Sequence, residues 1–346
     1  MPAFKDILGQ PHIKQEMQRA IAKNRVSHAY MIAGEALTGK KFIAGVMAQT
    51  LLCEHPVQSG NGVHQGPEPC GECAACKKVL ANAHPDLRIV THEKDTNLSV
   101  EEIRNQLTDS CYLRPFTGDR KVYIVPDAEL MADAAQNKLL KTLEEPPSYA
   151  TIILLTTSRE KMLPTIQSRC AVFSMQPVKD EVLRHYLTEV KKESSVSTEF
   201  AVRFAGGSAG RAVMLAQDKE FADRARHMIK VMTELQSMDV GRIHREMKDI
   251  FGSDCKDVRA RKEFFHICRC YLRDIMLFRA TSNSENLILR DQAEYISLVA
   301  RHTSFLRLAR ANEALDVAGM RLASNVNATY TLQFFFMQMR SLLRTA

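Results

Sequence analysis

The sequence lacks the features that mark membrane, exported and repetitive proteins. No apolar run approaches the roughly 18 residues that a membrane-spanning helix needs. The opening stretch, MPAFKDILGQ, has no basic segment followed by an apolar one, so we expect no export signal. The chain also contains no internal repeat and no long low-complexity tract. These absences predict a cytoplasmic protein without a membrane partner.

The composition is that of an ordinary globular protein. The chain has 346 residues, of which 45% are apolar and 25% are charged. This length exceeds what one hydrophobic core usually serves, so we expect two or three domains. The net charge of +7 permits contact with nucleic acid. A mixed, solvated surface gives a similar excess of positive charge, so the net charge alone does not indicate whether the protein binds nucleic acid.

Hydrophobic patterning predicts an α/β fold followed by an all-α region. In the first half, short apolar runs alternate with helical patterns, as in a parallel sheet with crossover helices. We expect strands at 28–33, 87–90, 122–125, 151–156 and 171–174. We expect helices at 41–53, 73–82, 99–110 and 133–144. After Pro177 the strand signals nearly vanish, and apolar residues recur three and four apart.

These patterns predict three domains. The α/β domain spans 1–175, a small helical domain spans 176–225, and a helical C-terminal domain spans 226–346. The glycine pair at 206–207 separates two helices of the second domain.

The stretch GEALTGKK, residues 34–41, nearly matches a phosphate-binding loop. Gly34, Gly39 and Lys40 fit the pattern of Gly, four residues, Gly and Lys, and the loop joins an expected strand to an expected helix. Lys41, however, stands where the pattern requires a Ser or Thr hydroxyl to hold magnesium. The alternative interpretation is a tight strand-to-helix turn whose glycines serve geometry alone.

A second ligand for magnesium is missing farther along the chain. Phosphoryl transfer needs an Asp after a later strand, and the candidate strand 121–125 is followed by Pro126 and Asp127. In the usual pattern this strand is followed by Asp-Glu or Asp-Asp. Pro126 stands at the first of these two positions, and a proline cannot ligate a metal through its side chain. We therefore expect no magnesium site of the chain's own, and ATP binding is left open.

The cysteines favour a metal site over disulfides. Nine cysteines are an odd number, and the chain has no export signal. Cys70, Cys73 and Cys76 lie three residues apart, and Cys53 ends the first crossover helix upstream. Four thiolates suit a tetrahedral structural zinc ion. The loop between them holds few apolar residues, so a metal would supply the missing cohesion.

Three alternatives to this zinc site remain open. An iron–sulfur cluster uses a similar triplet, although the usual following Cys-Pro is absent after Cys76. His55 or His64 could replace Cys53 as the fourth ligand. The triplet could also consist of free thiols on a helix surface.

The run AQNKLLKTLEEPP at 135–147, followed by a strand and by Ser168-Arg169-Cys170, resembles a bacterial clamp-loader subunit of the AAA+ class. The segments LGQ at 8–10 and SHAY at 27–30 resemble the entry to that family's first strand. The resemblance covers about the first 215 residues. It implies an AAA+ core with a four-cysteine zinc module inserted at about 53–76, a helical lid, and a helical collar for oligomerisation.

Two kinds of subunit share this architecture. The gamma and tau subunits are motors that hydrolyse ATP, whereas the delta-prime type does not act as a motor. Lys41 and Pro126 favour the second type, and so does Gly210, because motor subunits have an arginine there; Arg211 is one residue out of register. The resemblance thus implies a DNA polymerase III subunit without ATPase activity of its own.

On the sequence alone, Arg169 is an ordinary surface residue. The resemblance gives it the role of an arginine finger that reaches the ATP of a neighbouring subunit. It also implies partners, namely gamma or tau motor subunits and the delta subunit, in a ring that loads the sliding clamp on primed DNA. Two alternatives stay open: an active gamma/tau-like ATPase of the same fold, and a zinc-stabilised nucleic-acid-binding scaffold outside replication.

Overall fold

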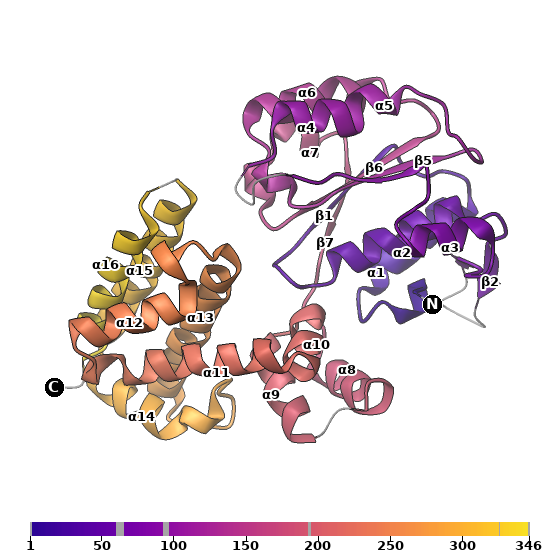
Figure 1. Ribbon diagram of the computed structural model, residues 1–346. Helices are drawn as coiled ribbons and strands as arrows, with labels where there is room; N and C mark the ends of the chain where they lie inside the picture. Colours follow the sequence, from indigo (N-terminus) through magenta and orange to yellow (C-terminus); the bar gives the residue numbers. More distant parts are fainter. Residues whose placement is uncertain (1, 60–65, 93–96, 193–194, 325, 345–346) are drawn as a thin grey trace. The chain divides into compact units, whose positions relative to one another are not determined.

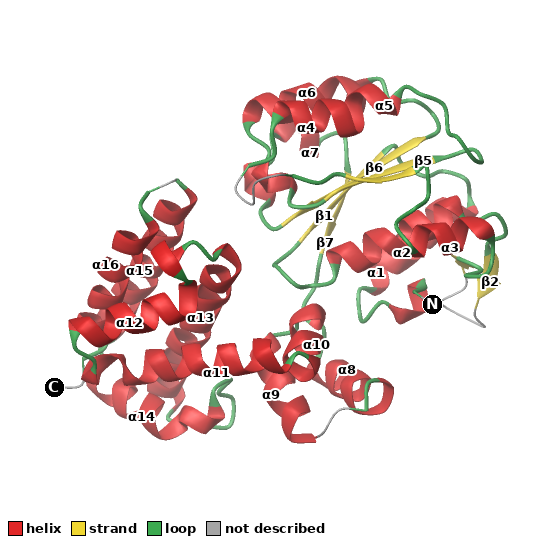
Figure 2. Cartoon of the chain, in the orientation of Figure 1, coloured by secondary structure: helices red, strands yellow, loops and turns green. Residues whose placement is uncertain are grey.

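The computed structural model describes residues 2–59, 66–92, 97–192, 195–324 and 326–344. The chain divides into two compact units, one of Met1–Val190 with Gly206–Arg211 and the other of Lys191–Ala205 with Ala212–Ala346. Every described strand belongs to the first unit, and the second contains only helices and turns (Figure 2). The predicted α/β fold followed by an all-α region is confirmed. The division into three domains stays a prediction.

A five-stranded parallel sheet forms the centre of the first unit, with strand order β4-β5-β6-β1-β7 (Figure 1). The strands are β1 Ala29–Ala33, β4 Leu87–Ile89, β5 Lys121–Val125, β6 Ala150–Thr156 and β7 Ala171–Ser174. β1 lies between β6 and β7, with Met31 opposite Leu154 and Val172. All five strands lie where the sequence predicts them, with ends that shift by at most one residue.

Helices cover both faces of the sheet because successive strand residues point to opposite sides (Figure 1). Tyr30 and Ile32 of β1 contribute to a core shared with the helices α1 and α2. Ala29 and Met31 contribute to the opposite core, shared with α4 and α6. These helices are α1 Pro11–Ala22, α2 Lys40–Leu52, α4 Val100–Ile103 and α6 Asp133–Glu144.

Shorter elements complete the first unit. They are η1 Phe4–Asp6, β2 Val57–Ser59, β3 Gly66–Glu68, α3 Ala74–Leu80, η2 Arg104–Thr108, α5 Asp109–Cys111, η3 Ala128–Leu130, η4 Arg159–Lys161, α7 Pro164–Gln167, α8 Asp180–His185 and η5 Tyr186–Val190. The helix expected at 99–110 begins with a capping box between Ser99 and Glu102, but the π-helical turn η2 interrupts it. The antiparallel pair of β2 and β3 was not predicted, because strands of three residues are too short for a periodic signal.

The second unit consists of helices around an aromatic core. The ring of Phe264 stacks on Phe336 with centroids 5.1 Å apart and meets Phe251 edge to face at 5.3 Å. All three side chains are buried. The elements are α9 Ser195–Ala205, α11 Lys219–Glu234, η6 Leu235–Ser237, α12 Val240–Phe251, η7 Ser253–Cys255, α13 Val258–Thr281, η8 Arg290–Gln292, α14 Ala293–His302, α15 Phe305–Ala323 and α16 Ala328–Leu342, while α10 Ala209–Gln217 passes from the first unit into the second. None of the helices in the described part of the chain has the length and apolar character needed to cross a bilayer.

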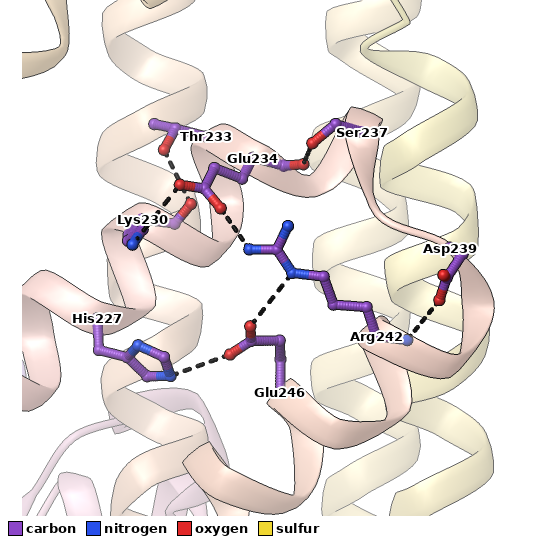
Figure 3. A network of polar contacts seen from close by, with 8 residues as sticks. All are labelled: His227, Lys230, Thr233, Glu234, Ser237, Asp239, Arg242 and Glu246. Carbon is purple, nitrogen blue, oxygen red and sulfur yellow. Dashed lines mark hydrogen bonds and ion pairs between the residues drawn. The ribbon is translucent and has the colours of Figure 1, made fainter.

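A polar network joins α11 to α12 (Figure 3). Arg242 of α12 donates to Glu234 at 2.5 Å and lies 3.6 Å from Glu246. His227 of α11 contacts the other oxygen of Glu246 at 3.1 Å. Asp239 caps α12 by accepting from the backbone N–H of Arg242 at 2.6 Å. These contacts fix the turn between the two helices.

Gln136 of α6 connects that helix to the segment before α7. Its buried amide donates to the carbonyls of Met131 and Lys161, each at 3.0 Å, and its oxygen accepts from the N–H of Leu163 at 2.8 Å. The side chain therefore fixes the start of α7, whose C-terminal end leads directly to Arg169.

We predict that Gln136→Leu destabilises the first unit, because it leaves three backbone groups without their partner at a buried site. The free energy of unfolding should fall by about 1–3 kcal/mol, measured by urea denaturation of the full chain. The control is Asn137→Leu, which changes an exposed amide of the same helix. Equal stability of the two variants would show that the Gln136 contacts contribute little.

Candidate functional site

The loop between β1 and α2 depends on two glycines. Gly39 precedes α2 with a φ of +98°, a conformation that favours glycine. A Cβ atom at Gly34 would lie 2.6 Å from the Cβ of Met175, which follows β7, so only glycine fits there. The two glycines that the sequence singles out are thus required by geometry.

Lys40 is turned onto this loop. Its ammonium group donates to the carbonyl oxygens of Gly34 at 2.5 Å and of Glu35 at 2.6 Å. Burial lowers the pKa of Lys40 to about 8, although the nearby carboxylates of Glu129 and Asp127 act in the opposite direction. The lysine expected to bind phosphate is therefore bonded to the backbone of its own loop.

The segment 208–210 lies directly on the same loop. The carbonyl oxygen of Leu37 accepts from the N–H of Gly210 and from the hydroxyl of Ser208, each at 2.8 Å. A Cβ atom at Gly210 would lie only 2.4 Å from that oxygen. No side chain fits at Gly210 in this arrangement, and an arginine there would have to push the loop away.

The acidic residues after β5 are also engaged. Pro126 follows the strand, and Asp127 adopts the left-handed conformation with its carboxylate 3.9 Å from His92. The carboxylate of Glu129 accepts from the backbone N–H of Thr157 at 3.1 Å and from its hydroxyl. Lys41 is exposed on the first turn of α2. The positions that hold magnesium in a working loop carry a lysine and a proline here.

Several of these residues were not identified from the sequence. Thr157 and Met175 follow the parallel strands β6 and β7, whose carboxyl ends lie at the same edge of the sheet as that of β1. Ligand sites of open parallel sheets form at this edge, and that rule could have found both residues. Ser208 lies beside Gly210, whose position the family resemblance places near the ATP phosphates, but nothing in the sequence indicated its own contact with Leu37.

The structure brings together the four cysteines that the sequence singles out. One sulfur from each of Cys53, Cys70, Cys73 and Cys76 lies within 4.8 Å of all the others. The Sγ of Cys53 lies 3.5 Å from that of Cys70 and 4.0 Å from that of Cys73. These separations exceed a disulfide bond of about 2.05 Å. A tetrahedral zinc ion with Zn–S bonds of about 2.3 Å places its sulfurs about 3.8 Å apart, so the cluster fits such an ion.

Backbone N–H groups point at these sulfurs. Cys70 donates to Cys53, Cys73 to Cys70 and Cys76 to Cys73, at 3.3–3.4 Å. The N–H groups of Cys73 and Glu72 lower the pKa of the Cys70 thiol to about 6, which favours the thiolate that a metal requires. Burial raises the pKa of the Cys53 and Cys76 thiols, so these two need the positive charge of a metal to ionise. His55 is not part of this cluster, and His64 lies outside the described residues.

The cysteine insert is attached to the N-terminal segment through Glu68 of β3. This buried carboxylate accepts from the backbone N–H of Phe4 at 2.6 Å and from the amide of Gln18 at 3.2 Å. Gly66 allows the close approach, because a Cβ atom there would lie 2.6 Å from the Cβ of Gln18. The insert therefore supports α1 and is not an isolated surface loop.

Arg169 follows α7 and is partly exposed, with 35% of its side chain accessible. Its guanidinium contacts the carboxylate of Glu144 at 2.8 Å and donates to the carbonyl of Thr165 at 2.9 Å. Arg169 is thus held by two contacts while part of its charged head still faces solvent.

Comparison with known proteins identifies the family. A family model described as DNA polymerase III, delta subunit, matches residues 9–179. The DNA polymerase III subunit delta' of Bacillus subtilis is 28% identical over 321 residues, which cover 92% of each chain. The tau subunit of the same organism is 27% identical over 303 residues, which cover 82% of this chain and 52% of tau.

The chain therefore spans about half the length of tau. Among solved structures, a gamma subunit-related protein from Thermotoga maritima superimposes with a TM-score of 0.47 and 19% identity, over 96% of this chain and 100% of that one. On the matched family model and the similarity to delta' over 92% of both sequences, the chain belongs to the clamp-loader family of DNA polymerase III.

Proposed function

We propose that the chain is a non-motor clamp-loader subunit of the delta-prime type. The observation that carries this proposal is the closed phosphate loop, in which Lys40 is bonded to Gly34 and Glu35, while Ser208 and Gly210 are bonded to Leu37. Phosphoryl transfer needs the lysine on the phosphates and a magnesium ion held by the protein. In this chain the lysine is bonded to its own loop, and Lys41 and Pro126 replace the two side chains that would ligate magnesium.

The similarity to tau favours a second candidate, an ATP-hydrolysing motor subunit of the gamma/tau type. That function would require the loop to open and water to replace the ligands lost at Lys41 and Pro126. The similarity to delta', which extends over 92% of both sequences, supports the first candidate without these requirements.

The proposed role in catalysis is exerted on a neighbouring subunit. Arg169 lies at the end of α7 with its guanidinium partly in solvent, where it can stabilise charge on the phosphates of a neighbour's ATP. A chain can lose its own metal site and still be required for hydrolysis at the next site. This role would explain why the chain has the α/β fold of an ATPase although it does not hydrolyse ATP itself.

The proposed partners follow from this role. They are gamma or tau motor subunits and the delta subunit, in a ring that opens the sliding clamp and places it on primed DNA. This process takes place in the cytoplasm, and the chain meets clamp and DNA as a member of the complex.

The proposed cofactor is one structural zinc ion held by Cys53, Cys70, Cys73 and Cys76. The sulfur separations and the N–H groups directed at the sulfurs support it. The ion would join the end of α2 to the start of α3 and hold the insert in place. It would have no part in hydrolysis, since the insert contributes no residue to the phosphate loop.

We expect one zinc per chain in protein purified without added metal, measured by mass spectrometry of the metal content. Cys73→Ser should lose the ion and lower the thermal midpoint, because the end of α2 and the start of α3 are then no longer joined by the metal. Cys170→Ser removes a thiol outside the cluster and should keep the zinc. Full zinc in Cys73→Ser, or iron with a visible absorbance band, would refute the assignment.

We expect Arg169→Ala to leave folding, zinc content and ring assembly unchanged and to reduce DNA-stimulated ATP hydrolysis by the assembled complex. An arginine finger is typically worth about 10³–10⁵ in rate at one site. Other sites keep their own fingers, so the total rate should fall only by the share of the neighbouring site. The measurement compares steady-state hydrolysis and clamp loading by rings that contain wild-type or variant chain.

The control for this comparison is Arg88→Ala, which removes an exposed arginine from β4 at the edge of the sheet. It should leave both rates unchanged. If Arg169→Ala behaves like this control, Arg169 is a surface residue and the proposed function loses its mechanism.

A further inference from the structure

The guanidinium of Arg169 is held from two directions. Glu144, the last residue of α6, contacts one terminal nitrogen at 2.8 Å, and the carbonyl of Thr165 accepts from the other at 2.9 Å. The two partners come from different helices, so the contacts fix both the direction of the side chain and the plane of its head group. A long charged side chain loses rotamer freedom when it is held in this way, so the head group of Arg169 is oriented before any ligand arrives.

We propose that Glu144 is a positioning residue that orients Arg169 for the ATP site of a neighbouring subunit. This inference rests on the proposed function, because it assumes that Arg169 acts on a neighbour. It assigns a role to a carboxylate that contacts neither ATP nor the neighbour in the proposed mechanism.

The donor count of arginine supports this role. A guanidinium has five N–H groups, and the contacts with Glu144 and Thr165 occupy two of its nitrogens with one bond each. Three N–H groups remain for an incoming phosphate. Glu144 can therefore orient the head group without using up the donors that the phosphate needs.

A strong ion pair with Glu144 would keep Arg169 away from a neighbour's phosphate, whereas a weak one would only orient it. Both side chains are half-exposed, with 35% of Arg169 and 50% of Glu144 accessible, and ion pairs at such sites are weak. A phosphate group that carries more charge than one carboxylate can displace Glu144 at little cost. The contact therefore orients Arg169 before the neighbour binds and does not sequester it.

The end of α6 is built to keep Glu144 in place. Pro146 and Pro147 cannot continue a helix, so α6 ends at Glu144. The buried Gln136 of the same helix fixes the segment that leads into α7. The carboxylate and the arginine are thus carried by two helices whose separation is fixed by hydrogen bonds of the buried Gln136.

The chain offers a matched control in Glu145. This residue is exposed and carries the same charge one position farther on, and it makes no ion pair within the part of the chain that the structure describes. Glu144→Gln and Glu145→Gln remove the same charge from the same surface. A difference between them therefore reports the contact with Arg169 and not the local potential.

The test measures kcat and KM for DNA-stimulated ATP hydrolysis by reconstituted rings with equal assembly and equal thermal midpoints of the variant chains. The part of the wild-type rate that Arg169→Ala removes is taken as the Arg169-dependent rate. Glu144→Gln should remove at least half of it through kcat, with KM for ATP changed less than twofold. Glu144→Asp should restore most of the loss, and Glu145→Gln should cause none.

The double variant Glu144→Gln/Arg169→Ala should equal Arg169→Ala alone, because Glu144 acts only through that arginine. A wild-type or higher rate in Glu144→Gln would overturn the inference and leave the role of Arg169 intact. An additional loss in the double variant would show that Glu144 is a structural residue. If Arg169→Ala itself has no effect, the proposed function fails, and the positioning role fails with it.

Discussion

The ammonium group of Lys40 donates to the carbonyl oxygens of Gly34 and Glu35, and the account of the phosphate loop depends on this contact. On the same loop, the carbonyl of Leu37 accepts from Ser208 and Gly210. That approach in turn leaves no room for a side chain at Gly210. Under the proposed function, the departures from the motor pattern at Lys41, Pro126 and Gly210 belong to one altered site.

The parallel sheet gives this site its shape independently of what the loop binds. The carboxyl ends of β1, β5, β6 and β7 meet at one edge, and each strand delivers a loop to it. The same layers carry α6 and α7, which present Arg169. A subunit that lost this core would therefore lose the proposed arginine finger as well.

Long, strongly patterned elements could be predicted from the sequence. The strand β7 and the helix α6 lie where their apolar patterns place them, and the four cysteines meet as their spacing indicates. The antiparallel pair of β2 and β3 was not predictable, because a strand of three residues is too short to show an alternating pattern. The break at η2 was not predictable, because its five residues are too few to show a change of helical period.

The contacts that matter most at the site also lie beyond sequence reasoning. Those of Ser208 with Leu37 and of Glu144 with Arg169 join positions that no local pattern relates.

The most direct test of the closed loop is equilibrium binding of radiolabelled ATP to the isolated chain with magnesium present, together with its turnover. The account predicts no saturable binding at concentrations up to about 1 mM, the upper end of typical KM values, and no turnover. Micromolar binding with turnover, both lost in Lys40→Ala, would contradict it and identify a motor subunit.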